Sequence, residues 1–107
     1  MRFEILLAPQ AVEGLKAIRA DFQAGVLEAI ELHLRHEPAK VSRSRIKRLR
    51  GLAQPQYRLR VNEVRVFYDV TETTVEVLAI ITKEQAEAWL AESGIPTTPS
   101  GSGDDEG

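Results

Sequence analysis

Three arginines, Arg58, Arg60 and Arg65, lie on two short segments with the alternating pattern of β-strands. The predicted strands span 57–61 and 64–68. Two residues, Asn62 and Glu63, separate them, which is the spacing of a tight β-hairpin. Because guanidinium groups bind phosphates and carboxylates by charge and by directed hydrogen bonds, these three residues are the first candidates for a functional site.

The expected register places the three arginines on one face of the hairpin and the apolar side chains on the other. It pairs Arg60 with Arg65, and Arg58 with Phe67. Like charges directly opposite each other destabilise a strand pair, by a few tenths of a kcal/mol to about 1 kcal/mol. The pattern therefore favours an anionic ligand on this face. The alternative is an ordinary charged surface, on which the arginines spread into solvent.

Positive charge is concentrated in the middle of the chain, although the net charge is −2. Nine of the 14 lysines and arginines lie between Lys40 and Arg65, where Glu63 is the only acid. A local field of this kind attracts anions even near net neutrality. We expect five more cations of this region to contact an anionic polymer such as RNA: Arg43, Arg45, Lys47, Arg48 and Arg50.

Composition excludes several other chemistries. A chain of 107 residues forms one domain with one modest core. It contains no cysteine, which excludes disulfides and zinc–thiolate sites and fits a cytoplasmic protein. His33 and His36 have no accompanying carboxylates at metal-ligand spacing, and glycine-rich phosphate loops are missing. No apolar run is long enough to span a membrane. We expect no metal, no cofactor and no membrane association.

The chain before the hairpin predicts one strand and two helices. Residues 2–7 suit an opening strand, a helical pattern starts at Pro9, and a second one covers 23–36. Residues 20–25 either separate two helices or bend a single long one. The expected apolar stripes are Ala11, Leu15, Ile18 and Phe22 on the first helix, and Val26, Leu27, Ile30 and Leu34 on the second.

Further strands are predicted on both sides of the hairpin. After a polar loop over 39–45, a short strand is expected over 46–52, followed by a turn over 53–55. Residues 74–81 are apolar on both faces, which is typical of a central strand. Along this strand, Val75, Val77, Ala79 and Ile81 are expected to alternate with Glu76, Leu78 and Ile80. Tyr57 and Tyr68 are predicted to face the core, away from the arginines.

The last helix is expected to begin with a capping box of Thr82 and Gln85 and to bury Ala86, Trp89 and Leu90. Gly94 and Pro96 mark its end. These elements predict an α+β domain over 1–93, with an N-terminal strand, a helical hairpin packed on a small antiparallel sheet, and a C-terminal helix. Residues 94–107 are rich in Gly, Pro, Ser and acids, and predict a flexible tail.

Four motifs, taken together, resemble the RelE/ParE superfamily of toxins from type II toxin–antitoxin systems. They are Lys47-Arg48-Leu49-Arg50-Gly51-Leu52, Tyr57-Arg58-Leu59-Arg60-Val61, Val64-Arg65-Val66-Phe67-Tyr68-Asp69-Val70 and Val75-Glu76-Val77-Leu78. The likeness covers about residues 2–92. It implies a small α+β fold with a basic sheet, and the positions that match the family's basic strand residues are Arg58, Arg60 and Arg65.

The resemblance to the RelE branch implies a function. Such a toxin binds messenger RNA in the ribosomal A site and cleaves it without a metal, by attack of a ribose 2′-hydroxyl on the adjacent phosphate, and so inhibits translation. The implied catalytic residues are Arg58, Arg60 and Arg65, with Lys83 and Glu84 as partial substitutes for the family's later residues. The implied partner is a cognate antitoxin, with operator DNA bound only through the antitoxin complex.

The chain departs from the RelE pattern after its last strand. RelE-type nucleases usually carry an arginine and a tyrosine there, or a histidine–tyrosine pair, and Leu90 occupies about the place of the tyrosine. Two alternatives therefore stay open. One is a ParE-like inhibitor of DNA gyrase, and the other is an inactive member that only binds its antitoxin.

Overall fold

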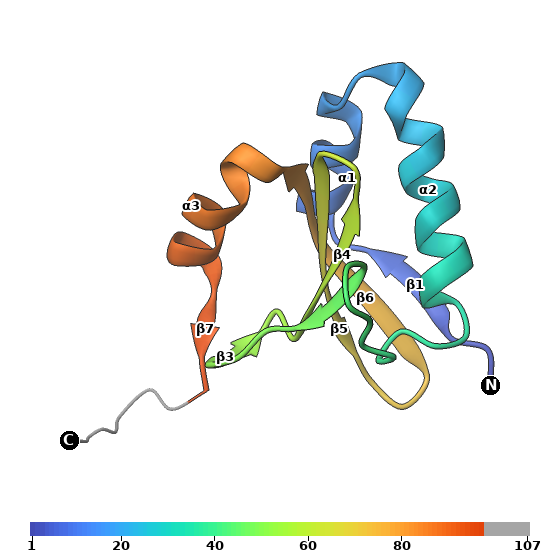
Figure 1. Cartoon of the computed structure of the whole chain (residues 1–107), viewed down its shortest axis with the longest axis vertical. Coiled ribbons are helices and arrows are strands. Elements are labelled where there is room, and N and C mark those ends of the chain that lie inside the picture. Colours follow the sequence, from blue (N-terminus) through green and yellow to red (C-terminus); the bar gives the residue numbers. More distant parts are fainter. Residues whose placement is uncertain (98–107) are drawn as a thin grey trace.

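A five-stranded sheet separates two helical layers in the computed structural model, which describes residues 1–97 (Figure 1). The strand order is β1-β6-β5-β4-β2. β1 runs parallel to β6 and the other neighbours are antiparallel, so the sheet is mixed and not purely antiparallel as expected. The strands are β1 (Glu4–Leu7), β2 (Ile46–Arg48), β4 (Tyr57–Val61), β5 (Val64–Val70) and β6 (Thr74–Thr82).

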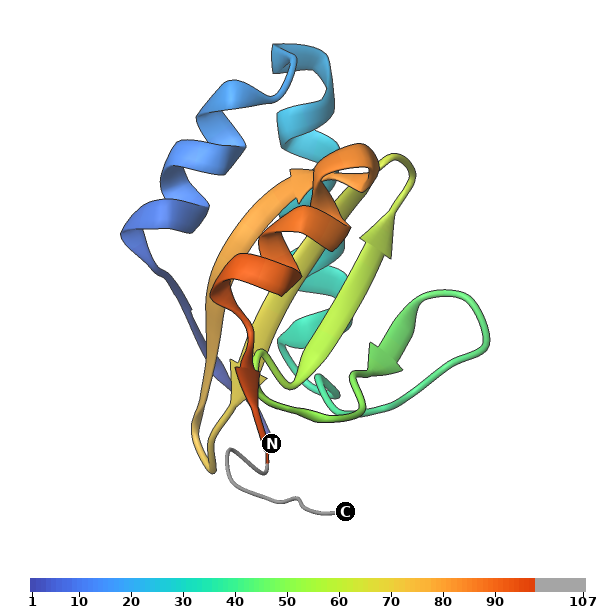
Figure 2. The ribbon, with the colours of Figure 1, turned by 90° about the vertical axis from the view of Figure 1, so that its left-hand side faces the viewer.

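Two helices, α1 (Pro9–Ala17) and α2 (Ala20–Leu34), cover one face of the sheet, and α3 (Lys83–Ser93) lies on the other (Figures 1 and 2). The predicted α+β order of strand, two helices, strands and helix is confirmed. Ile18 has an extended backbone and Arg19 has a ψ of 140°, which is not helical, so α1 and α2 are separate helices. No helix within residues 1–97 has the length and hydrophobicity required to cross a membrane.

The central hairpin has the predicted register. Arg60 pairs with Arg65, Arg58 with Phe67, and the turn lies at Asn62 and Glu63. Asn62 adopts a φ of 55°, in the left-handed region that asparagine tolerates better than most residues. The predicted central position of β6, between β1 and β5, is also confirmed.

A bulge in β6 changes the predicted core pattern. Val77 pairs with Tyr68 and Ala79 pairs with Phe67, so Leu78 is the extra residue. Beyond the bulge, Ile80 joins Val75 and Val77 in the core cluster, whereas the predicted alternation put Ile80 on the opposite face. The bulge therefore turns Ala79, although buried, toward the α3 side of the sheet along with its partner Phe67.

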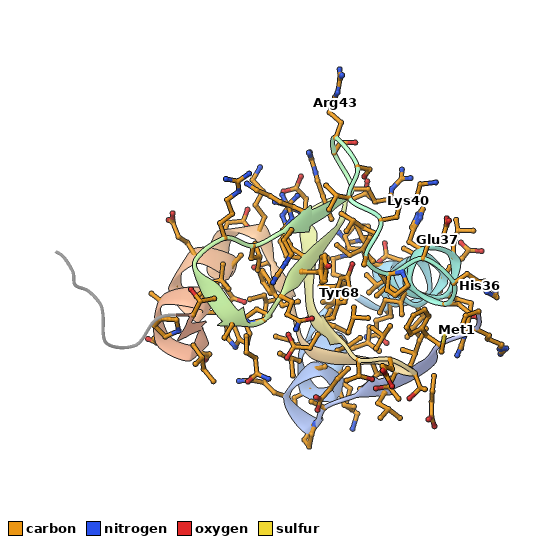
Figure 3. All side chains as sticks on the ribbon, turned by 90° about the horizontal axis from the view of Figure 1, so that it is seen from below. Met1, His36, Glu37, Lys40, Arg43 and Tyr68 are labelled. Carbon is orange, nitrogen blue, oxygen red and sulfur yellow. The ribbon has the colours of Figure 1, made fainter. Side chains whose placement is uncertain are left out.

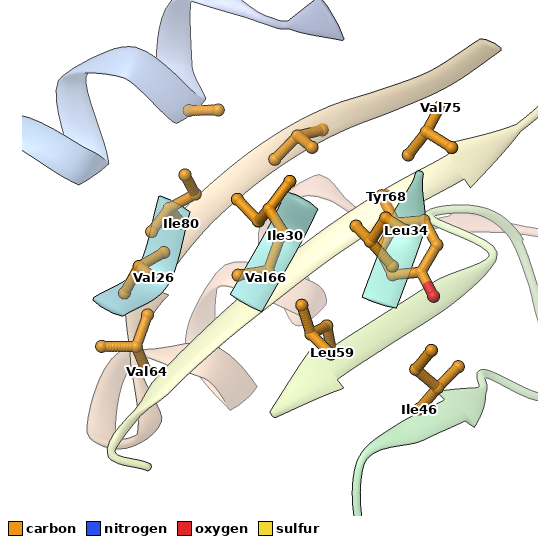
Figure 4. Close-up of a cluster of buried hydrophobic side chains, with 12 residues drawn as sticks. Val26, Ile30, Leu34, Ile46, Leu59, Val64, Val66, Tyr68, Val75 and Ile80 are labelled. Atoms are coloured by element: carbon orange, nitrogen blue, oxygen red, sulfur yellow. The ribbon is translucent and has the colours of Figure 1, made fainter. Parts of the chain in front are cut away.

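The core lies between the helical hairpin and the sheet (Figure 4). It brings together buried residues from α1 and α2 and from strands β2, β4, β5 and β6. Tyr57 and Tyr68 stack with ring centroids 5.5 Å apart, and the Tyr68 hydroxyl donates to the Pro38 carbonyl at 2.6 Å. Burial raises the pKa of the Tyr68 hydroxyl above its usual value. The labelled members of the cluster are Val26, Ile30, Leu34, Ile46, Leu59, Val64, Val66, Tyr68, Val75 and Ile80.

Two residues of the predicted helical stripes lie outside this core. Phe22 is 48% exposed and Leu27 is 45% exposed. Phe22 lies in α2 and not in α1. The break between the two helices therefore removes it from the apolar stripe predicted for the first helix. Leu27 directly follows the buried Val26. Because adjacent side chains of a helix point about 100° apart, Val26 faces the sheet and Leu27 lies at the edge of the contact.

A second sheet of two short strands lies at the end of α3. It pairs β3 (Leu52–Gln54) with β7 (Ile95–Pro96), so the predicted strand over 46–52 is two strands, and the predicted turn over 53–55 is wrong at its first two residues. Pairing of β7 extends past the predicted domain boundary at Ser93. Residues 98–107 of the predicted tail lie outside the described residues.

The third helix begins where expected, with Thr82 as its N-cap. However, within residues 1–97 the Thr82 side chain makes no cap hydrogen bond, so the predicted capping box does not form. None of residues 83–93 is fully buried. Ala86, Trp89 and Leu90, predicted as a buried stripe, are half-buried.

Candidate functional site

Alternation along β4 and β5 places the arginines on the face of the sheet that lies toward α3. Leu59 and Val66 pair with each other and are fully buried against the helical hairpin. Their neighbours Arg58, Arg60 and Arg65 must therefore extend from the opposite face. Lys47 of β2 pairs with Arg58, which adds a fourth cation to the same face.

A cleft of about 360 Å³ separates this basic face from α3. The strands and the segment after β2 contribute one wall, and α3 contributes the other. Figure 2 shows α3 in front of these strands. Both walls contribute cations to the cleft. The cleft is lined by Lys47, Leu49, Arg58, Arg65, Phe67, Lys83, Ala86, Glu87 and Leu90. We call it the cationic cleft.

Arg58 is the cation with the least favourable surroundings. Its Nε is buried and has no hydrogen-bond partner among residues 1–97. Burial, and then the charges of Arg65 and Arg60, lower the pKa of the Arg58 guanidinium. A buried donor without an acceptor costs about 1–3 kcal/mol. An anion in the cationic cleft would supply both the acceptor and the opposite charge.

Arg65 and Arg60 occupy different places on the same face. Arg65 lines the cleft, and its Nη1 donates to the carbonyls of Asn62 at 2.8 Å and of Val64 at 3.2 Å. Arg60 is exposed and lines a neighbouring depression together with Ser44, Arg45 and Asn62. The three predicted arginines thus share a face, but only Arg58 and Arg65 share the cleft.

The helix side brings in Lys83 and leaves out Glu84. Lys83 lines the cleft, and its Nζ lies 3.9 Å from a carboxylate oxygen of Glu63. Glu84 is exposed and does not line the cleft. Glu87, which sequence reasoning missed, is the acid that lines it. Its spacing of four residues from Lys83 is the signal that could have identified it.

With this geometry in place, the comparison with known families is decisive. Residues 5–87 match the family described as the ParE toxin of type II toxin–antitoxin systems, parDE. The chain belongs to this family. It is therefore a toxin of the RelE/ParE superfamily, as the motifs indicated. No curated protein matches its sequence.

Solved structures show that the fold of this toxin is shared with RelE proteins. It is similar to a chain of the archaeal RelE–RelB complex from Pyrococcus horikoshii OT3, with a TM-score of 0.63, 22% identity, and coverage of 78% of this chain and 97% of that chain. The RelBE2 toxin–antitoxin complex from Mycobacterium tuberculosis gives a TM-score of 0.61, 22% identity, and coverage of 77% and 99%. The RelB–RelE complex from Methanococcus jannaschii gives a TM-score of 0.61 and 19% identity, and the match covers 78% of this chain and 96% of that chain.

The other predicted RNA-binding residues of the toxin are not gathered in the cleft. Arg48 lies on the core-facing side of the sheet, where its guanidinium is 5.2 Å from the centroid of Tyr57 and donates to the Gln56 carbonyl at 2.8 Å. Arg43 projects from the tip of the loop before β2 (Figure 3), Arg45 adjoins Arg60, and Arg50 is exposed in the turn after β2.

Trp89 attaches α3 to the sheet. Its ring stacks on Phe67 with centroids 5.1 Å apart, and its Nε1 donates to Oε1 of Gln10 at 3.3 Å. Because Phe67 pairs with Arg58, this stack lies beside the cationic cleft and determines which face of α3 covers it.

The two histidines lie near the C-terminus of α2, which covers the opposite face of the sheet from α3. They line a shallow pocket with Lys40 and Arg45. Burial, followed by the charge of Arg45, lowers the pKa of His33. Within residues 1–97, no group of three histidine, aspartate or glutamate side chains could hold a metal ion.

Proposed function

We propose that this toxin is a ribosome-dependent endoribonuclease that cleaves messenger RNA in the A site. The observation that carries the proposal is the cationic cleft, where Lys47, Arg58, Arg65 and Lys83 line a space that contains one acid. The buried, unpartnered Nε of Arg58 supports an anion as the ligand. A ribose–phosphate group carries the required charge and acceptor oxygens.

The cleft residues suit a phosphate that changes charge during reaction. When a ribose 2′-oxygen attacks the adjacent phosphorus and the bond to the 5′ oxygen breaks, negative charge gathers on the phosphate oxygens. Arg58, Arg65 and Lys83 approach from two walls and would stabilise that charge where water has been displaced. They would also hold the phosphate in line for attack.

Cations outside the cleft would bind the RNA on either side of the cleaved phosphate. Arg60 and Arg45 adjoin each other next to the cleft, while Arg43 and Arg50 are exposed farther away. Such contacts add affinity without sequence preference. Arg48 is the exception, because its contact with Tyr57 holds it on the other face of the sheet.

A cognate antitoxin is the proposed protein partner. The solved structures that share the fold are complexes of RelE proteins with RelB. A segment of an antitoxin that contributed carboxylates to the cationic cleft would occupy the same charges as RNA and so block them. Operator DNA would be bound through the antitoxin complex.

The test is induced expression without antitoxin, together with mapping of cleavage on programmed ribosomes. Arg58→Ala and Arg65→Ala should each lower the cleavage rate by about 10²–10³-fold and relieve growth arrest, because each removes a charge that stabilises the transition state. Lys16→Ala, which removes an exposed cation of α1 on the opposite side of the sheet, is the matched control and should stay toxic. Full arrest and cleavage by both cleft variants at equal protein levels would exclude this mechanism.

Inhibition of DNA gyrase is a second candidate, favoured by the match to the ParE family over residues 5–87. Purified toxin would then inhibit supercoiling by gyrase and leave ribosome-bound messenger RNA intact. A third candidate, an inactive antitoxin-binding member, is favoured by Leu90, which lines the cleft where RelE nucleases usually carry a tyrosine. Harmless expression in cells without antitoxin would support it.

A further inference from the structure

We infer that Glu87 is the general base of this toxin and removes the proton from the attacking ribose 2′-hydroxyl. The inference rests on the proposed endoribonuclease function. It assigns a catalytic residue on α3, at a position that the sequence pattern did not single out. Three features of the structure lead to it: the place of Glu87 in the cleft, its lack of an ion pair, and the charge of its surroundings.

Glu87 is on the face of α3 that covers the cleft. It follows Lys83 by four residues, and together with Ala86 and Leu90 these residues form the helical wall. Glu87 is the only acid that lines the cleft within the described residues 1–97. Glu84 directly follows Lys83, so its side chain leaves the helix about 100° away. The stack of Trp89 on Phe67 fixes this rotation of the helix.

Glu87 lines the cleft together with four cations, Lys47, Arg58, Arg65 and Lys83. Within residues 1–97 the ion pairs of the toxin do not include Glu87. The ordinary explanation for a glutamate here is an ion pair with Lys83 across one helical turn. Lys83 instead lies nearest to Glu63, at 3.9 Å. Glu87 therefore lines a cleft of about 360 Å³ opposite Arg58 and Arg65 without forming an ion pair within residues 1–97.

A carboxylate in a phosphate-binding cleft weakens binding by repulsion. Phosphate binding alone gives no reason for an acid between Lys83 and Leu90. A base placed across the cleft from Arg58 and Arg65 has a chemical reason, because the nucleophile of the proposed reaction is a hydroxyl that must lose its proton. The cations then hold the phosphate while the carboxylate faces the sugar.

The proposed step is balanced. The Glu87 carboxylate accepts the 2′-hydroxyl proton, the 2′-oxygen forms a bond to phosphorus, and the bond from phosphorus to the 5′ oxygen breaks. The leaving oxygen takes a proton from water, and Glu87 later returns its proton to solvent. The products are a 2′,3′-cyclic phosphate and a free 5′-hydroxyl, without oxidant, metal or cofactor.

The experiment compares E87Q with E84Q in the full-length toxin. Both glutamates are exposed, so both variants should fold, which circular dichroism would verify. On ribosomes with a cleavable A-site codon, E87Q should cleave about 100-fold more slowly or worse, and E84Q should match the wild type. On ribosomes whose codon carries 2′-deoxyriboses, E87Q should bind as tightly as the wild type or more tightly, because a repelling charge is gone.

Several outcomes would overturn the inference. If Glu87 only repels RNA, E87Q will cleave as fast as the wild type or faster. If it only supports the fold or the binding surface, binding of E87Q to the deoxy codon will fall in proportion to cleavage. Both results leave the proposed function intact, since the wild type still cleaves. Absence of cleavage by the wild type would remove the proposed function and this inference together.

Discussion

The two faces of the hairpin formed by β4 and β5 have opposite properties, although their residues alternate along the same strands. Leu59 and Val66 are fully buried beneath α2. Arg58 and Arg65, one position away from them, line a cleft beneath α3. An apolar cluster fills the first side, whereas on the second side α3 is attached by the stack of Trp89 on Phe67 and by hydrogen bonds from Trp89 and Lys83.

This difference shows how one short element can serve two purposes. Successive side chains of a strand point to opposite faces of the sheet. Residues on one face can therefore stabilise the fold, while their neighbours in the sequence can bind a ligand on the other face. The core side supplies the burial that maintains the fold. The α3 side accepts an unfavourable arrangement of like charges, which is typical of a surface that binds an oppositely charged ligand. Substitutions on the two sides should therefore change stability in different directions.

The largest effect is expected for Leu59→Ala. Leu59 is fully buried in the centre of the core, and removing its side chain should lower the free energy of unfolding by about 2–5 kcal/mol. Its neighbour Arg60 is exposed, so Arg60→Ala should change the same quantity by less than about 0.5 kcal/mol. Urea unfolding followed by circular dichroism measures both. Equal losses would mean that the two faces do not differ as described.

A smaller effect is expected where α1 packs against the sheet. A Cβ atom at Gly14 would clash with the backbone carbonyl oxygen of Ile80 in β6. Gly14→Ala should therefore push α1 away and lower the free energy of unfolding by about 1–3 kcal/mol.

Gly25 provides the matched control for that substitution. It lies within α2, and a Cβ there would meet nothing within 4 Å. Gly25→Ala should stabilise the toxin by roughly 0.5–1 kcal/mol, because alanine loses less backbone entropy in a helix. Thermal unfolding of the two variants should shift in opposite directions. A stabilising Gly14→Ala would show that the contact between α1 and β6 is looser than the structure indicates.

The hairpin could be predicted from sequence because its pattern is unambiguous. Arg58 and Arg60 alternate with Tyr57, Leu59 and Val61, and Arg65 lies between Val64 and Val66, so a shift by one residue would move the arginines into the core. The same argument fails in β6. From Val77 to Ile81 every residue is apolar, and a one-residue bulge at Leu78 leaves no mark in such a run. The predicted alternation was therefore correct up to Val77 and wrong beyond it.

The helical wall of the cleft could not be predicted for a different reason. Sequence shows that Lys83, Glu84 and Glu87 follow the central strand, but not how the helix is rotated about its axis. That rotation depends on the contact between Trp89 and Phe67, which are 22 residues apart in the chain. Tertiary packing therefore brought Glu87 into the cleft and left the predicted Glu84 outside it.

The smallest predicted effect on stability is the most informative about the cleft. Arg58→Met keeps the apolar stem of the side chain, while it removes a charge next to Arg65 and Arg60 and a buried Nε that has no partner among residues 1–97. The free energy of unfolding should rise by a few tenths of a kcal/mol to about 1 kcal/mol, and the gain should shrink as salt screens the repulsion.

Arg50→Met is the control for Arg58→Met, since Arg50 is exposed in a turn outside the cleft. Urea unfolding at low and high ionic strength should show a salt-dependent gain for Arg58→Met and little change for Arg50→Met. A gain in stability combined with lost toxicity would mean that Arg58 is retained for a ligand at a cost to the fold. If Arg58→Met instead destabilises the toxin, the arginine supports the structure, and the two faces of the hairpin are alike in purpose.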